Sequence, residues 1–202
     1  MFRTASYLLC LLLFAGCQKE IASSSLPQHT APIVLPAPTT GFVQYTIKAG
    51  EHFCDKNDLK LLETDQLKFL VRFDSSAIYE TVDPANQDDI NKLYGFSDNG
   101  AQHHQFSARF GWRWSAGALR LFGYVYNNSL LISKEISTVP IGEAVNCELE
   151  VTPAHYRFTV GNKKDSLPRL STTPKAKGYQ LYPYFGGDEP APHAILIQIK
   201  EN

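Results

Sequence analysis

The amino-acid sequence predicts an all-β domain, built as a β-jelly-roll sandwich of two antiparallel sheets. Short segments in which apolar and polar residues alternate follow one another along the chain. Clusters of Gly, Pro, Asn and Asp separate these segments, and none of them has the spacing of a long amphipathic helix. Many short strands joined by such turns are typical of sandwiches and jelly rolls.

The expected strands come in chain order, each with apolar residues at alternate positions. Phe69, Val71 and Phe73 share one face of the second segment, for example. The segments are 42–48, 67–73, 77–81, 103–114, 118–126, 130–137, 146–151, 155–160, 179–185 and 194–200. We expect turns at 97–100, 126–129, 160–166 and 185–192, and a short helix-like turn at 87–93.

Two adjacent segments between residues 103 and 126 carry chemically active side chains on one face. Their other face is apolar, so Phe106, Phe110 and Trp112 are expected to lie buried between the sheets. The cationic and phenolic side chains of the active face suit a carbohydrate groove; the alternative is that they decorate a solvated sheet face. This face carries His103, Gln105, Ser107, Arg109 and Arg113 in the first segment, and Arg120, Phe122, Tyr124 and Tyr126 in the second.

The beginning of the chain is typical of a bacterial lipoprotein. Arg3 precedes a short apolar run, and small residues stand directly before Cys17. We therefore expect a signal peptide at 1–16, a lipid on Cys17, and a disordered tether over 17–40 that is rich in Pro, Ser and Thr. The expected location is the outer membrane, at the cell surface or the periplasmic face. The alternative is an ordinary secretory signal cleaved elsewhere.

The remainder, 41–202, has the length of one domain with an adequate core. The chain has a net charge of −1 and no basic run, which argues against a nucleic-acid partner. Cys54 and Cys147 could form a disulfide in an oxidising compartment, or Cys147 could be a buried free thiol.

No spacing of Cys and His predicts a zinc site. The acidic segment 83–98 could offer oxygen ligands to calcium, but a solvated turn-forming loop accounts for it better. His103 and His104 would point to opposite faces of a strand, so that one is buried and the other is available.

Four motifs resemble, in order, those of jelly-roll alginate and glucuronan lyases, in particular polysaccharide lyase family fourteen. They are NKLYGF at 91–96, FSARFGWR at 106–113, YVY at 124–126 and YFGGDEPAP at 184–192. The resemblance covers roughly residues 60–202, and Tyr94 stands where the family usually has proline. It implies a concanavalin-like fold and an acidic polysaccharide or oligosaccharide as the partner.

The resemblance also implies a set of site residues. The family's functional lysine falls on Lys92, its serine and arginine on Ser107 and Arg109, and its tyrosine pair on Tyr124 and Tyr126. The resemblance also matches an upstream histidine of the family with His103. We expect catalytic roles for Lys92, Arg109, Tyr124 and Tyr126, and substrate-binding roles for His103, Gln105, Ser107, Arg113, Gln180, Tyr182 and Tyr184.

The chemistry of β-elimination fits these residue types. A lyase removes the C5 proton of a uronic acid and expels the C4-linked oxygen, which requires neutralisation of the adjacent carboxylate. Lys92 and Arg109 could supply that neutralisation, and Tyr124 or Tyr126 could transfer the proton if nearby cations favour the ionised phenol. Neither a metal nor an organic cofactor is required.

Two other functions remain open. In a non-catalytic carbohydrate-binding or structural lipoprotein, Tyr124, Tyr126, Tyr182 and Tyr184 would stack on sugar rings while Arg109 fixes their orientation. A glycoside hydrolase is less favoured, because such an enzyme needs two facing carboxylates and the polar strand faces carry almost none.

Overall fold

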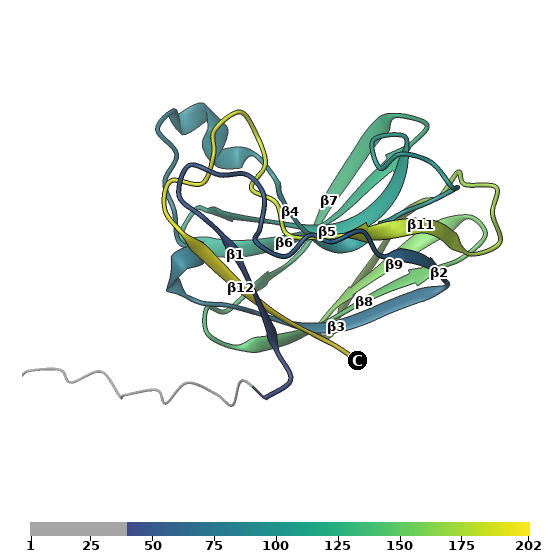
Figure 1. Cartoon of the computed structure of the whole chain (residues 1–202), viewed down its shortest axis with the longest axis horizontal. Coiled ribbons are helices and arrows are strands. Elements are labelled where there is room, and N and C mark those ends of the chain that lie inside the picture. The colour runs from purple at the N-terminus through teal and green to yellow at the C-terminus, as the bar shows by residue number, and fades with distance from the viewer. Residues whose placement is uncertain (1–39) are drawn as a thin grey trace, which may run out of the picture. The chain divides into compact units, whose positions relative to one another are not determined.

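The computed structural model describes residues 40–202, so the expected signal peptide and nearly all of the expected tether, Cys17 included, lie outside the described residues. The described part is an all-β jelly-roll sandwich, as predicted. Its strands form two antiparallel six-stranded sheets that face each other (Figure 1). No helix in residues 40–202 is long and apolar enough to cross a membrane.

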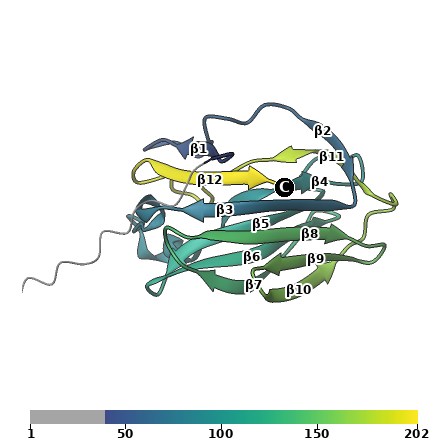
Figure 2. The same ribbon diagram turned by 90° about the horizontal axis from the view of Figure 1, so that it is seen from below.

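Each sheet combines strands from distant parts of the chain, and Figure 2 shows how the strands follow one another across the sheets. The first sheet contains, in spatial order, β1 (Val43–Ile47), β12 (Ile195–Glu201), β3 (Gln66–Phe73), β8 (Ala144–Val151), β9 (His155–Val160) and β10 (Lys163–Pro168). The second contains β2 (Leu61–Thr64), β11 (Ala176–Leu181), β4 (Asn91–Ser97), β5 (Phe106–Ser115), β6 (Ala118–Asn127) and β7 (Leu130–Val139). Two short 3-10 helices, η1 (Ser75–Ala77) and η2 (Pro84–Asp88), lie between β3 and β4.

The core lies between the two sheets and consists of the side chains that point inward from alternate positions of each strand. Phe110 of β5 meets Phe69 of β3 and Phe158 of β9 edge-on, with ring centroids 5.5 and 5.2 Å apart. Phe110 and Trp112 are fully buried, as the alternation predicted. Phe106 is only partly buried, which corrects the prediction, because it opens β5 at the end of the sandwich.

Several expected elements differ from the structure. The chain forms η1 where 77–81 was expected to start a strand, because the Asp74 carboxylate accepts the Ser76 amide and caps the turn. The expected turn at 160–166 holds most of β10, an edge strand in which only Leu167 is buried. The short strand β2 was not predicted, because its sequence has no clear alternation of apolar and polar residues. Most residues of the expected helix-like turn at 87–93 belong either to the end of η2 or to the start of β4.

Buried and exposed residues do not alternate regularly along β4, because this strand contains a β-bulge. The register to β5 shifts between Lys92 and Gly95, so β4 has one residue more than its partner. As a result Leu93 and Tyr94 are both buried, whereas a regular strand would turn one of them outward. The bulge nevertheless returns Gly95 to a position directly opposite Arg109.

Both cysteines of the described domain are free and buried. The Cys54 thiol donates a hydrogen bond to the carbonyl of Lys56, and Cys147 faces the core from β8. The free-thiol alternative therefore holds, and no disulfide joins the two.

The acidic segment 83–98 has two distinct environments. Asp83 caps η2 at the surface, as expected of a turn-forming residue. Asp98, by contrast, is fully buried and accepts hydrogen bonds from Arg169 Nε at 2.8 Å and from the Tyr156 hydroxyl at 2.6 Å. Placing Asp98 in a solvated loop was thus wrong. Residues 40–202 contain no cluster of three or more His, Cys, Asp or Glu side chains that could hold a metal ion.

Candidate functional site

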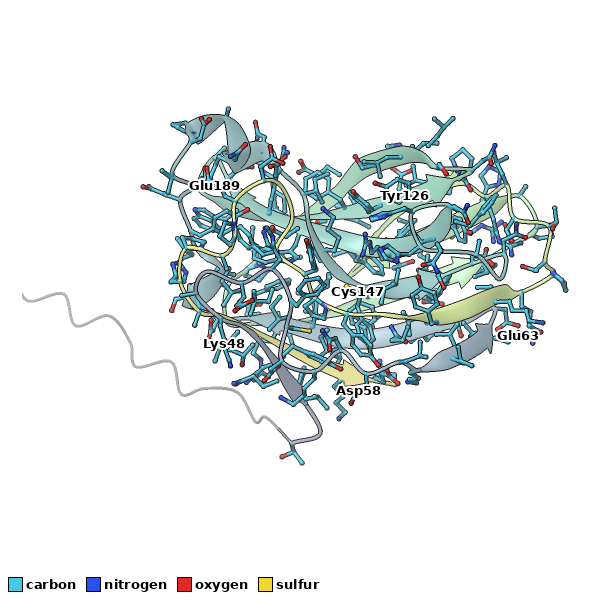
Figure 3. The ribbon with its side chains drawn as sticks, turned by 45° about the horizontal axis from the view of Figure 1, so that its top comes forward. Lys48, Asp58, Glu63, Tyr126, Cys147 and Glu189 are labelled. Carbon is cyan, nitrogen blue, oxygen red and sulfur yellow. The ribbon has the colours of Figure 1, made fainter. Side chains whose placement is uncertain are left out.

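A groove of about 630 Å³ lies on the outer face of the second sheet, away from the core. Its floor comes from β4, β5, β6 and β11, and its rim from the segments before β2 and after β11. Figure 3 labels Tyr126 on β6 and Asp58 before β2, which both line it. The lining residues are Phe53, Asn57, Asp58, Leu59, Lys92, His103, His104, Arg109, Tyr124, Tyr126, Tyr179, Gln180, Leu181, Tyr182, Pro183, Tyr184 and Gly187.

Arg109 occupies the floor of this groove. Gly95 lies directly opposite Arg109, and a Cβ at Gly95 would collide with the carbonyl oxygen of Ala108 and with Cα and Cβ of Arg109, so the two strands approach closely only because this residue is glycine. Arg109 is 6% exposed, and it makes no hydrogen bond or ion pair with any residue in 40–202. Its guanidinium carbon lies 5.2 Å from the centre of the Tyr124 ring. Burial lowers its pKa to about 10.

Lys92 is the second cation of the groove. Its ammonium nitrogen lies 5.2 Å from the Tyr124 ring centre and 6.0 Å from that of Tyr184. The backbone holds it in place, because Lys92 and Tyr184 exchange two hydrogen bonds of 2.8 and 3.0 Å. Burial first, and then repulsion by Arg109, lower the pKa of Lys92 to about 8. The two cations therefore destabilise each other, and an anion between them would relieve that repulsion.

The two tyrosines of β6 stand beside these cations. Tyr124 pairs with Arg109 across the strands and is buried, while Tyr126 is partly exposed. Their ring centroids are 5.8 Å apart. Burial, followed by interaction with the Tyr126 hydroxyl, raises the pKa of Tyr124 despite the opposing effect of Arg109. This differs from our expectation that cations would make the phenol ionise readily, because desolvation is the larger effect here.

Both histidines line the groove, which corrects the expectation that only one is available. Residues 103–105 form a turn, not a strand, so the alternation rule does not separate the two rings. Their centroids are 4.2 Å apart, and His104 meets Tyr126 edge-on at 5.4 Å. Nδ1 of His103 lies 2.9 Å from the Tyr179 hydroxyl. Burial, Arg109 and His104 together lower the pKa of His103 to about 4, so this imidazole is neutral at pH 7.

Three of the expected substrate-binding residues lie outside the groove. Ser107 is fully buried and donates its hydroxyl to the carbonyl of His103, so it supports the turn. Arg113 is paired with Asp88, with Nη2 3.4 Å from a carboxylate oxygen. Gln105 lines a neighbouring cavity of about 720 Å³, which shares Tyr179 with the groove.

The other expected site residues come together. Lys92, Arg109, Tyr124 and Tyr126 share the groove with His103, Gln180, Tyr182 and Tyr184. Gln180 is buried and its amide donates to the carbonyl of Gly95 at 2.6 Å, which fixes the bulge beneath Arg109. Sequence reasoning missed Phe53, Asn57, Asp58 and Leu59, because they precede the motifs and have no strand pattern.

No family model and no curated protein matches the chain. Among solved structures, alginate lyase AlyC3 is similar with a TM-score of 0.51 and 10% identity, over 80% of this chain and 74% of that one. The laminarinase catalytic domain of Thermotoga maritima MSB8 is similar with a TM-score of 0.51 and 10% identity, over 79% and 75%. At such identities the likeness shows a shared fold alone.

Proposed function

We propose that this domain binds an acidic polysaccharide in the groove and cleaves it by β-elimination at a uronic-acid unit. The observation that carries the proposal is the guanidinium of Arg109, which is 6% exposed and makes no hydrogen bond or ion pair with any residue in 40–202. A buried cation is costly unless an anion or hydrogen-bond acceptor joins it. A sugar carboxylate is the matching anion, because Arg109 can bind it with two parallel hydrogen bonds while Lys92 adds a second positive charge.

The residues of the groove can perform each part of the reaction. Arg109 and Lys92 neutralise the carboxylate, which acidifies the neighbouring C5 proton. Tyr126 releases its hydroxyl proton to solvent and then accepts the C5 proton; the electron pair left behind forms the C4=C5 double bond, and the C4–O bond breaks. Tyr124 keeps its proton in the resting groove because its pKa is raised. It donates this proton to the leaving oxygen, and transfer of a proton from Tyr126 to Tyr124 restores both groups.

A non-catalytic carbohydrate-binding domain is the second candidate. The raised pKa of Tyr124 favours it, because a phenol that holds its proton tightly is a poor base and a good hydrogen-bond donor to a bound sugar. A glycoside hydrolase receives no support, because Asp58 is the single carboxylate that lines the groove within residues 40–202.

The proposal extends to location. The short apolar run before Cys17 supports lipid attachment at that residue, followed by a tether to the domain. The groove would then meet polymers at the outer membrane, on the cell surface or its periplasmic face.

The test is incubation of the purified domain with alginate, polyglucuronate and polygalacturonate while the ultraviolet absorbance of the unsaturated product is followed. We expect absorbance to rise with at least one polymer, and Arg109→Ala to weaken both binding and turnover. Binding without any absorbance change would favour the second candidate. A protein that neither binds nor cleaves any of the three would contradict both.

A further inference from the structure

Phe53 is an exposed aromatic side chain on the rim of the groove, in the loop between β1 and β2. It is 62% exposed, whereas every tyrosine that lines the groove is at least partly buried. The exposed ring keeps apolar surface in contact with water, and a ligand that packs against the ring would bury that surface. Phe53 also precedes residues 60–202, where the lyase-like motifs lie, so the resemblance assigns it no role.

The backbone on both sides of Phe53 is firmly held. On one side, the His52 carbonyl accepts the Phe185 amide at 2.8 Å, and the His52 ring stacks on Tyr184 with centroids 5.4 Å apart. On the other side, Cys54 is buried, and its backbone forms an isolated antiparallel β-bridge with Ile47 of β1. The ring is therefore presented by a rigid segment, which lowers the entropic cost of binding a ligand against it.

Tyr184 connects this ring to the cations. The Phe53 ring meets Tyr184 edge-on at 4.9 Å, and the Lys92 ammonium lies 6.0 Å from the centre of the same Tyr184 ring. Leu59, which is 77% exposed, adds apolar surface to the same rim. The groove thus has an apolar rim next to a cationic floor, and this division matches a uronic-acid chain, whose rings have apolar C–H faces and carry their charge at the edge.

We propose that Phe53 is a sugar-stacking platform, against which one pyranose ring of the acidic polysaccharide packs while a neighbouring unit places its carboxylate at Arg109 and Lys92. The inference rests on the proposed function and deepens it. Phe53 contributes binding energy through its flat apolar face and takes no part in proton transfer. Its effect should therefore be equal in the ground state and the transition state.

The test compares Phe53→Ala, Phe53→Tyr and Leu170→Ala with the wild type, using alginate, polyglucuronate and polygalacturonate. Leu170 is the matched control, because it is 61% exposed and lines no cavity described above. We expect Phe53→Ala to raise Kd and KM about ten-fold with kcat unchanged, while Phe53→Tyr and Leu170→Ala behave like the wild type. Thermal unfolding of each variant establishes that the fold is intact.

The outcomes separate the two proposals. If the wild type binds a polymer and Phe53→Ala binds it equally well, the platform is refuted and the proposed function stands. A fall in kcat with KM unchanged would also refute it, because a platform acts through binding. A wild type that binds none of the three polymers would overturn the proposed function and the platform together.

Discussion

Arg109 is the residue on which the proposed function chiefly depends. Its guanidinium is buried and has no carboxylate partner among residues 40–202. Lys92 lies close enough for the two positive charges to repel each other, which lowers the pKa of Lys92. Another buried arginine of the sandwich, Arg169, is paired with Asp98 at 2.8 Å. The contrast shows that this fold can supply a partner where an arginine serves structure, and that the groove leaves its arginine available.

Replacing Tyr126 with phenylalanine tests the proton-transfer role. The change removes one hydroxyl and little packing, so we expect the fold and polymer binding to persist while turnover falls about 10² to 10⁴-fold. Turnover is followed by the absorbance of the unsaturated product, and binding by affinity electrophoresis. Tyr182→Phe is the control, since Tyr182 lines the same groove without contacting either cation. Unchanged turnover in Tyr126→Phe would remove this residue from the reaction.

The lowered pKa of Lys92 predicts a pH-dependent affinity. In the free protein this pKa is about 8, so the ammonium is charged below pH 8 and neutral above it. Affinity for an acidic polymer should therefore fall as the pH rises from 7 to 9. Arg109, with a pKa of about 10, stays charged in that range. Calorimetric titration of the wild type and Lys92→Ala checks this: the variant should bind more weakly, and its affinity should be flat across the window.

At the scale of strands, the site depends on how β5 and β6 divide their two faces. Phe110 points inward and Arg109 outward from neighbouring positions, so the packing of the core fixes where the guanidinium stands. The bulge in β4 places Gly95 opposite Arg109, and the absent side chain at Gly95 lets the two strands approach closely. A shift of one residue in β5 would turn Arg109 into the core.

Truncating Phe110 to alanine should therefore lower stability strongly. The ring is fully buried against Phe69 and Phe158, and its loss leaves a cavity, so we expect a decrease of about 3 to 5 kcal/mol in the free energy of unfolding. Urea denaturation followed by fluorescence measures it. Leu130→Ala, at a position 70% exposed, should change stability by less than about 0.5 kcal/mol. A small effect at Phe110 would mean that the core relaxes around the loss.

The strand pattern explains which parts of the site could be predicted. β5 and β6 alternate regularly, so the outward positions of Arg109, Tyr124 and Tyr126 follow from sequence alone. β4 has an extra residue, and the turn at 103–105 has no period, so neither the bulge nor the shared location of His103 and His104 could be derived that way. Phe53 reaches the groove through tertiary packing on Tyr184, for which the local sequence has no signal.

For the whole molecule, the proposed lipid on Cys17 is the feature that would determine where the groove works. Replacing Cys17 with serine removes the sulfur that would carry the lipid, so we expect a folded domain that leaves the membrane fraction. Fractionation of cells with immunodetection checks this, and Cys10→Ser is the matched control because residue 10 falls within the expected signal peptide. Retention of Cys17→Ser in membranes would show that attachment does not depend on Cys17.

The two buried free thiols can report on unfolding of the domain, because each becomes accessible to a reagent only when the structure around it opens. Burial raises the pKa of both Cys54 and Cys147, so neither reacts readily with an alkylating reagent while the fold is closed. Cys147 lies in the interior strand β8 and becomes accessible only when the sandwich opens as a whole, whereas Cys54 neighbours Phe53 in a loop at the edge. Alkylation rates at the two positions should therefore report separately, within one molecule, on opening of the loop that carries Phe53 and on unfolding of the whole domain.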